Sequence, residues 1–123
     1  MHVLVVDDDD EARTLLHSVL DYFGAEVHTV DSARSALTVA TQIIPEVVVS
    51  DIVMPGDDGF ALLRALKTRR ALRDVPVIAL TAYTAVHAAE DALSAGFSAY
   101  LRKPVEPWEL CRTIGRLRRG GPV

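Results

Sequence analysis

Residues 47–56 have the sequence VVVSDIVMPG, an apolar run that ends in an acid and then a turn. A run of this kind with no polar alternation is typical of a strand that is covered on both faces of a sheet. Asp51 follows the run directly, and a carboxylate at the end of a buried strand is costly to desolvate unless a cation or hydrogen-bond donors meet it. The stretch therefore predicts a buried parallel strand with a functional carboxylate at its end.

Strand and helix patterns alternate five times along the chain. The strand-like runs cover residues 2–6, 26–30, 46–50, 75–80 and 98–101. Apolar stripes at helical spacing follow them at residues 12–23, 33–40, 60–66, 85–93 and 107–117. Five such units with right-handed crossovers predict an α/β fold, a doubly wound five-stranded parallel sheet with helices on both faces. In such sheets, binding sites form outside the carboxyl ends of the strands.

The size and composition of the chain fit one domain. It has 123 residues, half of them hydrophobic, and we expect a domain over residues 1–119 with a tail or the start of a linker at 120–123. The formal net charge of -4 gives no sign of nucleic-acid binding. The single cysteine, Cys111, fits a reducing compartment, and no apolar run approaches the roughly 18 residues of a membrane span. We therefore expect a soluble cytoplasmic domain with no direct contact to nucleic acid or membrane.

Five polar side chains fall at or just past the ends of four predicted strands: Asp7, Asp8, Asp51, Thr81 and Lys103. The three carboxylates supply hard oxygen ligands, which suit Mg²⁺ when water and a backbone carbonyl complete the shell. Asp51 can also act as a nucleophile that forms an aspartyl phosphate. The Thr81 hydroxyl and the Lys103 ammonium can each meet a phosphoryl oxygen. The pattern favours a phosphoryl-transfer site, where positioning and charge neutralisation provide most of the catalysis.

The other polar residues have simpler explanations. Asp9, Asp10 and Glu11 are interpreted as the N-cap and first turn of a helix rather than as metal ligands. Two more acids precede Gly59 and are interpreted as turn residues: Asp57 and Asp58. The histidines are scattered with no metal-ligand spacing and are assigned no chemistry: His2, His17, His28 and His87.

Four segments together resemble the receiver domain of two-component response regulators: VLVVDDDDEARTLL (3–16), VVVSDIVMPGDDGF (47–60), VIALTAYT (77–84) and SAYLRKPVEPWEL (98–110). The resemblance extends over essentially the whole chain. It implies a flavodoxin-like (βα)5 fold with strand order 2-1-3-4-5. It also implies that Asp51 accepts a phosphoryl group from the phosphohistidine of a sensor histidine kinase or a histidine phosphotransfer protein. The implied Mg²⁺ ligands are Asp7, Asp8, Asp51 and the backbone carbonyl of Val53.

The resemblance further implies a conformational switch and a slow loss of the phosphoryl group from Asp51. Thr81 would be the switch hydroxyl, Tyr100 the switch aromatic, and Lys103 the phosphate-contacting lysine, followed by a cis peptide to Pro104. Phosphorylation would alter the face built from the elements at residues 85–93, 98–101 and 107–117, and a homodimer through this face is left open. Val53 and Tyr83 flank the approach of water in this family and orient it poorly here, which implies a long-lived phospho-Asp51.

The resemblance implies a signalling domain that catalyses only its own phosphorylation and dephosphorylation, and not an enzyme. A receiver module fused to a hybrid histidine kinase or to an output domain, passing phosphate onward, stays open. A phosphatase of the haloacid dehalogenase type would place its nucleophile in Asp7-Asp8-Asp9, but the chain lacks the cap and much of the length of that class. A flavodoxin-like nucleotide binder would need a first loop rich in small residues, whereas the four aspartates here repel phosphate.

Overall fold

The computed structural model describes residues 1–82 and 87–118, and the strands in this part form one parallel sheet. The strands are β1 (His2–Val6), β2 (Glu26–Val30), β3 (Val47–Ser50), β4 (Val77–Thr81) and β5 (Ala99–Arg102). Their order is β2-β1-β3-β4-β5, and every neighbouring pair is parallel. This confirms the predicted fold class and strand order.

The strand boundaries agree with prediction in β1 and β2 and differ by one or two residues in the other three. The largest difference is in β4, which begins at Val77 instead of residue 75 and extends to Thr81. Pro76 has no backbone N–H, so it cannot donate to a sheet ladder, and the strand begins after it. Its carbonyl still accepts a hydrogen bond from the Val48 N–H at 3.0 Å. Thr81 is therefore the last residue of the strand rather than the first residue beyond it.

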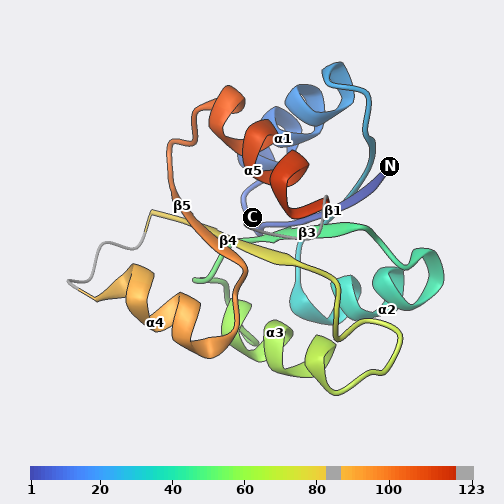
Figure 1. Ribbon diagram of the computed structural model, residues 1–123, viewed down its shortest axis with the longest axis vertical. Helices are drawn as coiled ribbons and strands as arrows, with labels where there is room; N and C mark the ends of the chain where they lie inside the picture. Colours follow the sequence, from blue (N-terminus) through green and yellow to red (C-terminus); the bar gives the residue numbers. More distant parts are fainter. Residues whose placement is uncertain (83–86, 119–123) are drawn as a thin grey trace.

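Five helices in the described residues cover the sheet: α1 (Asp10–Tyr22), α2 (Ala33–Ile43), α3 (Gly59–Lys67), α4 (Ala88–Ala95) and α5 (Pro107–Arg118). Figure 1 shows α1 and α5 on one face of the sheet and α2, α3 and α4 on the other. Asp9 is the N-cap of α1 and accepts a hydrogen bond from the Ala12 N–H at 3.0 Å, which confirms its predicted role. Asp58 was interpreted as a turn residue and is in fact the N-cap of α3, since it accepts from the Ala61 N–H at 2.9 Å.

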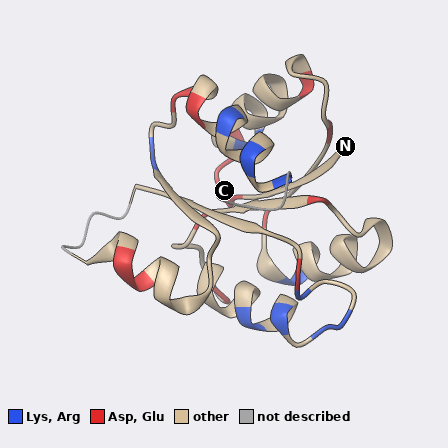
Figure 2. Cartoon of the chain, viewed as in Figure 1, with Lys and Arg blue, Asp and Glu red and all other residues tan. Residues whose placement is uncertain are grey.

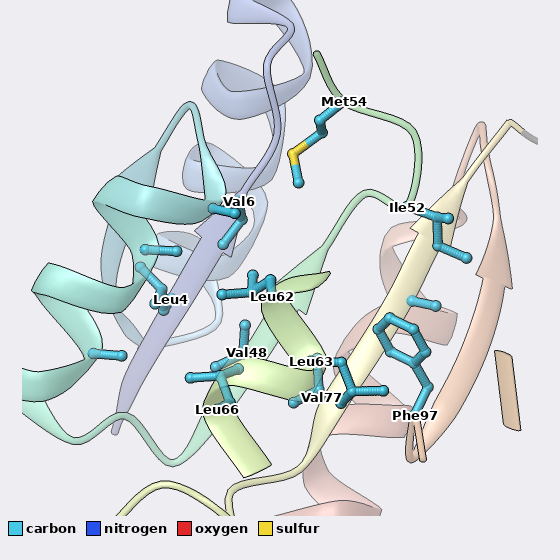
Figure 3. Packing of buried hydrophobic residues seen from close by; sticks show 14 of the residues in the cluster. Leu4, Val6, Val48, Ile52, Met54, Leu62, Leu63, Leu66, Val77 and Phe97 are labelled. Atoms are coloured by element: carbon cyan, nitrogen blue, oxygen red, sulfur yellow. The ribbon is translucent and has the colours of Figure 1, made fainter. Parts of the chain in front are cut away.

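The core consists of two apolar layers, one on each face of the sheet. Alternate residues of β1 face opposite layers, with Leu4 and Val6 in one and Val3 and Val5 in the other. Figure 3 shows the first layer, where α3 contributes Leu62, Leu63 and Leu66 against the strands. All residues of β3 and β4 are buried, as the absence of polar alternation predicts. These two central strands therefore provide a rigid base for the residues at their carboxyl ends.

Charged side chains lie outside these layers. Figure 2 shows Lys and Arg along the end of α3, the loop that follows it, and α5. The last turn of α5 contains Arg116 and Arg118, where positive charge complements the negative end of the helix dipole. Among residues 1–82 and 87–118, no helix combines the length and the apolar character needed to cross a bilayer. The predicted domain boundary at residue 119 and the tail at 120–123 lie outside the described residues.

Candidate functional site

The parallel ladder places Asp7 and Asp51 at the same edge of the sheet. β1 and β3 are neighbours, and the Asp51 N–H continues their ladder by donating to the Val6 carbonyl at 2.9 Å. On the other side of β1, the Asp7 N–H donates to the Val30 carbonyl at 3.1 Å. One carboxylate oxygen from each of Asp7, Asp8 and Asp51 lies within 4.8 Å of the others. The structure thus brings together the three acids that were singled out in the sequence.

Lys103 bridges two of these acids. Its Nζ lies 2.5 Å from Oδ2 of Asp7 and 3.0 Å from Oδ2 of Asp51. Only 1% of Asp7 and 9% of Asp51 are exposed, so these charges depend on protein partners. Burial of the Lys103 amine disfavours its charge, but the hydrogen bonds to Asp7 and Asp51 outweigh this cost and raise the pKa of Lys103 above its ordinary value. The lysine is therefore charged at neutral pH.

Backbone amides hold the second oxygen of each bridged carboxylate. The Asp9 N–H donates to Oδ1 of Asp7 at 3.0 Å, and the Val53 N–H donates to Oδ1 of Asp51 at 3.2 Å. Each carboxylate therefore has one oxygen on an amide and the other on the Lys103 ammonium. These contacts fix the plane of both groups, which is the preorganisation that charge-stabilising sites need.

Arg13 supports the site from α1 and is a residue that the sequence reasoning missed. Its Nη1 donates to the Asp7 backbone carbonyl at 2.7 Å, and its guanidinium also pairs with Asp10. The spacing of three residues between Asp10 and Arg13 is the signal that could have indicated an ordered arginine here. Arg13 thus fixes the backbone that presents Asp7.

The donor set at this edge fits a divalent cation. Three carboxylates and one ammonium leave two formal negative charges within a small volume. All the candidate side-chain ligands are oxygens of hard carboxylates, the ligand type that Mg²⁺ prefers. Asp8 is exposed, so the cluster opens to solvent on that side. The role of the Val53 carbonyl as a further ligand stays a prediction.

The remaining predicted site residues lie nearby or at neighbouring strand ends. Thr81 is 1% exposed and ends β4, which neighbours β3. The Lys103 N–H donates to the Thr81 carbonyl at 3.0 Å, so the same strand end positions both residues. Tyr100 is half-buried in β5 and packs against the first core layer. The peptide bond between Lys103 and Pro104 is cis.

Two residues were predicted to govern water access to the site. Val53, two residues after Asp51, is 58% exposed. Its side chain has no polar group that could orient a water molecule. Tyr83, the second residue of this prediction, lies outside the described residues. The predicted lifetime of a phosphorylated Asp51 therefore stays a prediction.

Gly59 is a second residue whose role the sequence reasoning missed. It begins α3, and its N–H donates to the Ile52 carbonyl at 2.8 Å. A Cβ at this position would lie 2.4 Å from the Asp51 carbonyl oxygen and 2.8 Å from the Ile52 Cα. Both atoms belong to the backbone, so any larger residue would displace the segment that presents the Asp51 carboxylate. The glycine after two acids was visible as a turn signal, but the close approach depends on how α3 packs.

Comparison with known proteins relates this chain to a family. The model of the response regulator receiver domain matches residues 3–115. An uncharacterized 14.6 kDa protein from the sodA1 3' region of Leptolyngbya boryana is 41% identical over 114 residues, which cover 93% of this chain and 87% of that protein. The C4-dicarboxylate transport transcriptional regulatory protein DctD of Pseudomonas aeruginosa is 44% identical over 114 residues. That match covers 93% of this chain but spans only 24% of DctD.

Two solved structures of similar shape are a chemotaxis protein and a signal receiver domain. The chemotaxis protein CheY4 of Vibrio cholerae superposes with a TM-score of 0.87 at 30% identity, covering 94% of this chain and 96% of CheY4. The signal receiver domain of a signal transduction histidine kinase from Syntrophus aciditrophicus superposes with a TM-score of 0.88 at 30% identity, covering 97% of this chain and 90% of that chain.

Proposed function

The chain belongs to the response regulator receiver domain family, which works in two-component signalling, and we propose that Asp51 is its phosphoacceptor. The observation that supports this most is the Lys103 ammonium, which joins Oδ2 of Asp51 to Oδ2 of Asp7 at the carboxyl edge of the sheet. A carboxylate beside a fixed cation and two further acids suits the transfer of a phosphoryl group to that carboxylate.

In the proposed reaction, a carboxylate oxygen of Asp51 attacks the phosphorus of a phosphohistidine. An O–P bond forms while the P–N bond breaks, and the imidazole leaves on the donor protein with the electron pair of that bond. The Val53 N–H holds the carboxylate plane, and the Lys103 ammonium stabilises negative charge on the phosphoryl oxygens. The Thr81 hydroxyl donates to another phosphoryl oxygen. Asp7, Asp8, Asp51 and the Val53 carbonyl would hold Mg²⁺, which supplies further positive charge to the phosphoryl group when bound.

Mg²⁺ affinity should depend on the acids at this edge. We expect Asp8→Ala and Asp51→Asn each to weaken Mg²⁺ binding at least about tenfold in a calorimetric titration, because each removes a charged ligand worth about 1.4 kcal/mol or more. Asp57→Asn is the matched control, since Asp57 is an exposed acid a few residues from Asp51 that is not in the cluster. Affinities for Asp8→Ala and Asp51→Asn equal to that of Asp57→Asn would contradict the metal assignment.

We further propose that phosphorylation changes the face formed by α4, β5 and α5. The Thr81 hydroxyl would move towards the phosphoryl group and Tyr100 would move inward, which shifts the population between two packings of this face. A hollow on this face is lined by residues of all three elements, among them Leu93, Tyr100 and Arg112. A homodimer through the same face is a partner arrangement that this proposal leaves open.

Beryllofluoride with Mg²⁺ should mimic the phosphorylated state. We expect amide chemical shifts in NMR spectra to change across α4, β5 and α5 as well as around Asp51, because Thr81 pairs with Arg102 of β5 and residues of all three elements line one hollow. Asp51→Asn should show none of these changes. Shifts that stay confined to the loops around Asp51 would mean that the chain has no switch of this kind.

The proposed donors of phosphate are a sensor histidine kinase or a histidine phosphotransfer protein. The likeness to the receiver domain of the Syntrophus histidine kinase favours, as a second candidate, a receiver module of a hybrid kinase that passes phosphate onward. The match to about a quarter of DctD equally fits fusion to an output domain.

Membership of the receiver family argues against the phosphatase and nucleotide-binding alternatives. A cytoplasmic location and the absence of enzymatic turnover beyond self-phosphorylation belong to the same proposal.

A further inference from the structure

A second group of side chains that could hold a metal ion lies near the amino-terminal ends of β1 and β2, away from Asp51. His2 begins β1, Glu26 begins β2, and His28 lies two residues further along β2. The parallel register pairs His2 with Glu26 and Leu4 with His28, so the three side chains share one face of the sheet. The sequence showed no metal-ligand spacing among the histidines, but His2 and His28 lie together because the register joins positions 26 residues apart.

Three ligand atoms of this cluster approach a common point. Nδ1 of His2 lies 3.1 Å from Nε2 of His28 and 2.9 Å from Oε2 of Glu26. Two nitrogen atoms that bind one Zn²⁺ at about 2.0–2.1 Å in tetrahedral geometry lie roughly 3.3–3.4 Å apart. The observed spacing of the two nitrogens is therefore close to that of a metal centre, and all three ligand atoms lie within 4.8 Å of one another.

All three contacting atoms can act as electron-pair donors. An N–H at Nδ1 of His2 can be shared between Oε2 of Glu26 and Nε2 of His28. A metal cation can take the place of that proton, because it accepts a lone pair from all three atoms.

We propose that His2, Glu26 and His28 form a binding site for a first-row transition metal ion, with Zn²⁺ as its occupant. Two imidazole nitrogens and one carboxylate suit Zn²⁺, whereas Mg²⁺ prefers sites made of oxygen ligands. The His2 and Glu26 side chains are 39% and 68% exposed, so an ion can enter from solvent and keep water as its remaining ligand. The two sites are at opposite ends of β1, about 16 Å apart along the strand.

The backbone around the cluster is held independently of the metal. The Glu26 N–H donates to the Met1 carbonyl at 2.6 Å, and the His2 N–H donates to Oε2 of Glu46 at 2.6 Å. β2 lies at the edge of the sheet, and among the described strands it pairs with β1 alone. A bound ion would cross-link this edge strand to its neighbour, and it would thereby stabilise the folded state by mass action.

Calorimetric titration with Zn²⁺ tests the proposal, using protein without a polyhistidine tag and with saturating Mg²⁺ present to occupy the carboxylate edge. We expect one equivalent of Zn²⁺ to bind, and we expect His2→Gln and His28→Gln to weaken the affinity at least about tenfold, since even the loss of outer-shell partners costs about 10- to 100-fold. Zn²⁺ should also raise the thermal unfolding midpoint of the wild type and leave that of His28→Gln unchanged.

His17→Gln is the matched control, because His17 is an exposed histidine on α1 outside the cluster. It should bind Zn²⁺ as the wild type does. Equal affinity in wild type and His28→Gln would overturn the proposal, as would an equal loss in His17→Gln. Loss of the Zn²⁺ equivalent in Asp51→Asn, with His28→Gln unaffected, would place the ion at the other edge of the sheet and would also overturn it.

Discussion

Asp51→Asn should abolish the phosphorylation of this chain by acetyl phosphate and Mg²⁺, while the wild type gains one phosphoryl group. The substitution replaces the carboxylate by a neutral amide of nearly the same shape, so the fold and the hydrogen bond from the Val53 N–H are retained but the nucleophile is lost. Intact-protein mass spectrometry measures the result. The label on the wild type should be removed by alkali, as expected for an acyl phosphate.

The control for this experiment is Asp57→Asn, which makes the same chemical change at an exposed acid in the same loop. It should accept one phosphoryl group as the wild type does. Label that persists in Asp51→Asn would show that another residue is the nucleophile, and Asp7 and Asp8 would then be examined in the same way. Label that disappears in both variants would indicate a general effect of charge in the loop.

Lys103→Met should lower the free energy of unfolding by about 3 kcal/mol, measured by urea denaturation at neutral pH. Removal of one member of a buried ion pair typically costs about 3–5 kcal/mol because it leaves an uncompensated charge. Here the substitution leaves Asp7 and Asp51 close together with no ammonium between them. The lower end of the range is expected because 22% of the lysine side chain is exposed.

Lys67→Met is the matched control, since Lys67 is exposed and its Nζ donates only to the Arg73 carbonyl, at 2.9 Å, among the described contacts. That substitution should change stability by no more than about 0.5 kcal/mol. Combining Lys103→Met with Asp51→Asn should restore part of the loss, because the second change removes one of the two facing charges. If Lys103→Met were as stable as Lys67→Met, the bridge would contribute nothing and the charges of the acids would have to be compensated in another way.

Asp51→Asn and Lys103→Met each remove one partner of the same ion pair. In the structure described, the Lys103 ammonium neutralises carboxylates that are expected to hold a cation and a phosphoryl group. The lysine therefore stabilises the unphosphorylated protein. Under the proposed function, it contacts a phosphoryl oxygen once Asp51 is phosphorylated. A charged group that exchanges one anionic partner for another can couple the chemistry at Asp51 to the end of β5, where Lys103 follows.

Local sequence patterns were sufficient to predict the α/β fold class and the position of the acids at the strand ends. The continuous apolar runs of β1, β3 and β4 predict strands covered on both faces, because only burial on both sides makes such runs favourable. Acids that directly follow two of these runs had to lie at the carboxyl edge of a parallel sheet. The strand order came from the resemblance to receivers, not from periodicity, which does not encode the order of strands.

Tertiary structure alone decided several of the contacts between residues that are far apart in the sequence. Lys103 contacts Asp7 across 96 positions and Asp51 across 52, and nothing near any of the three residues indicates that one ammonium bridges both acids. The close approach of Gly59 to the Asp51 backbone depends on the packing of α3, and the meeting of His2 with His28 depends on the register between β1 and β2. Local pattern reports whether a residue is buried and which period it follows. Distances between remote side chains follow from strand order, register and packing, which arise only when the whole chain has folded.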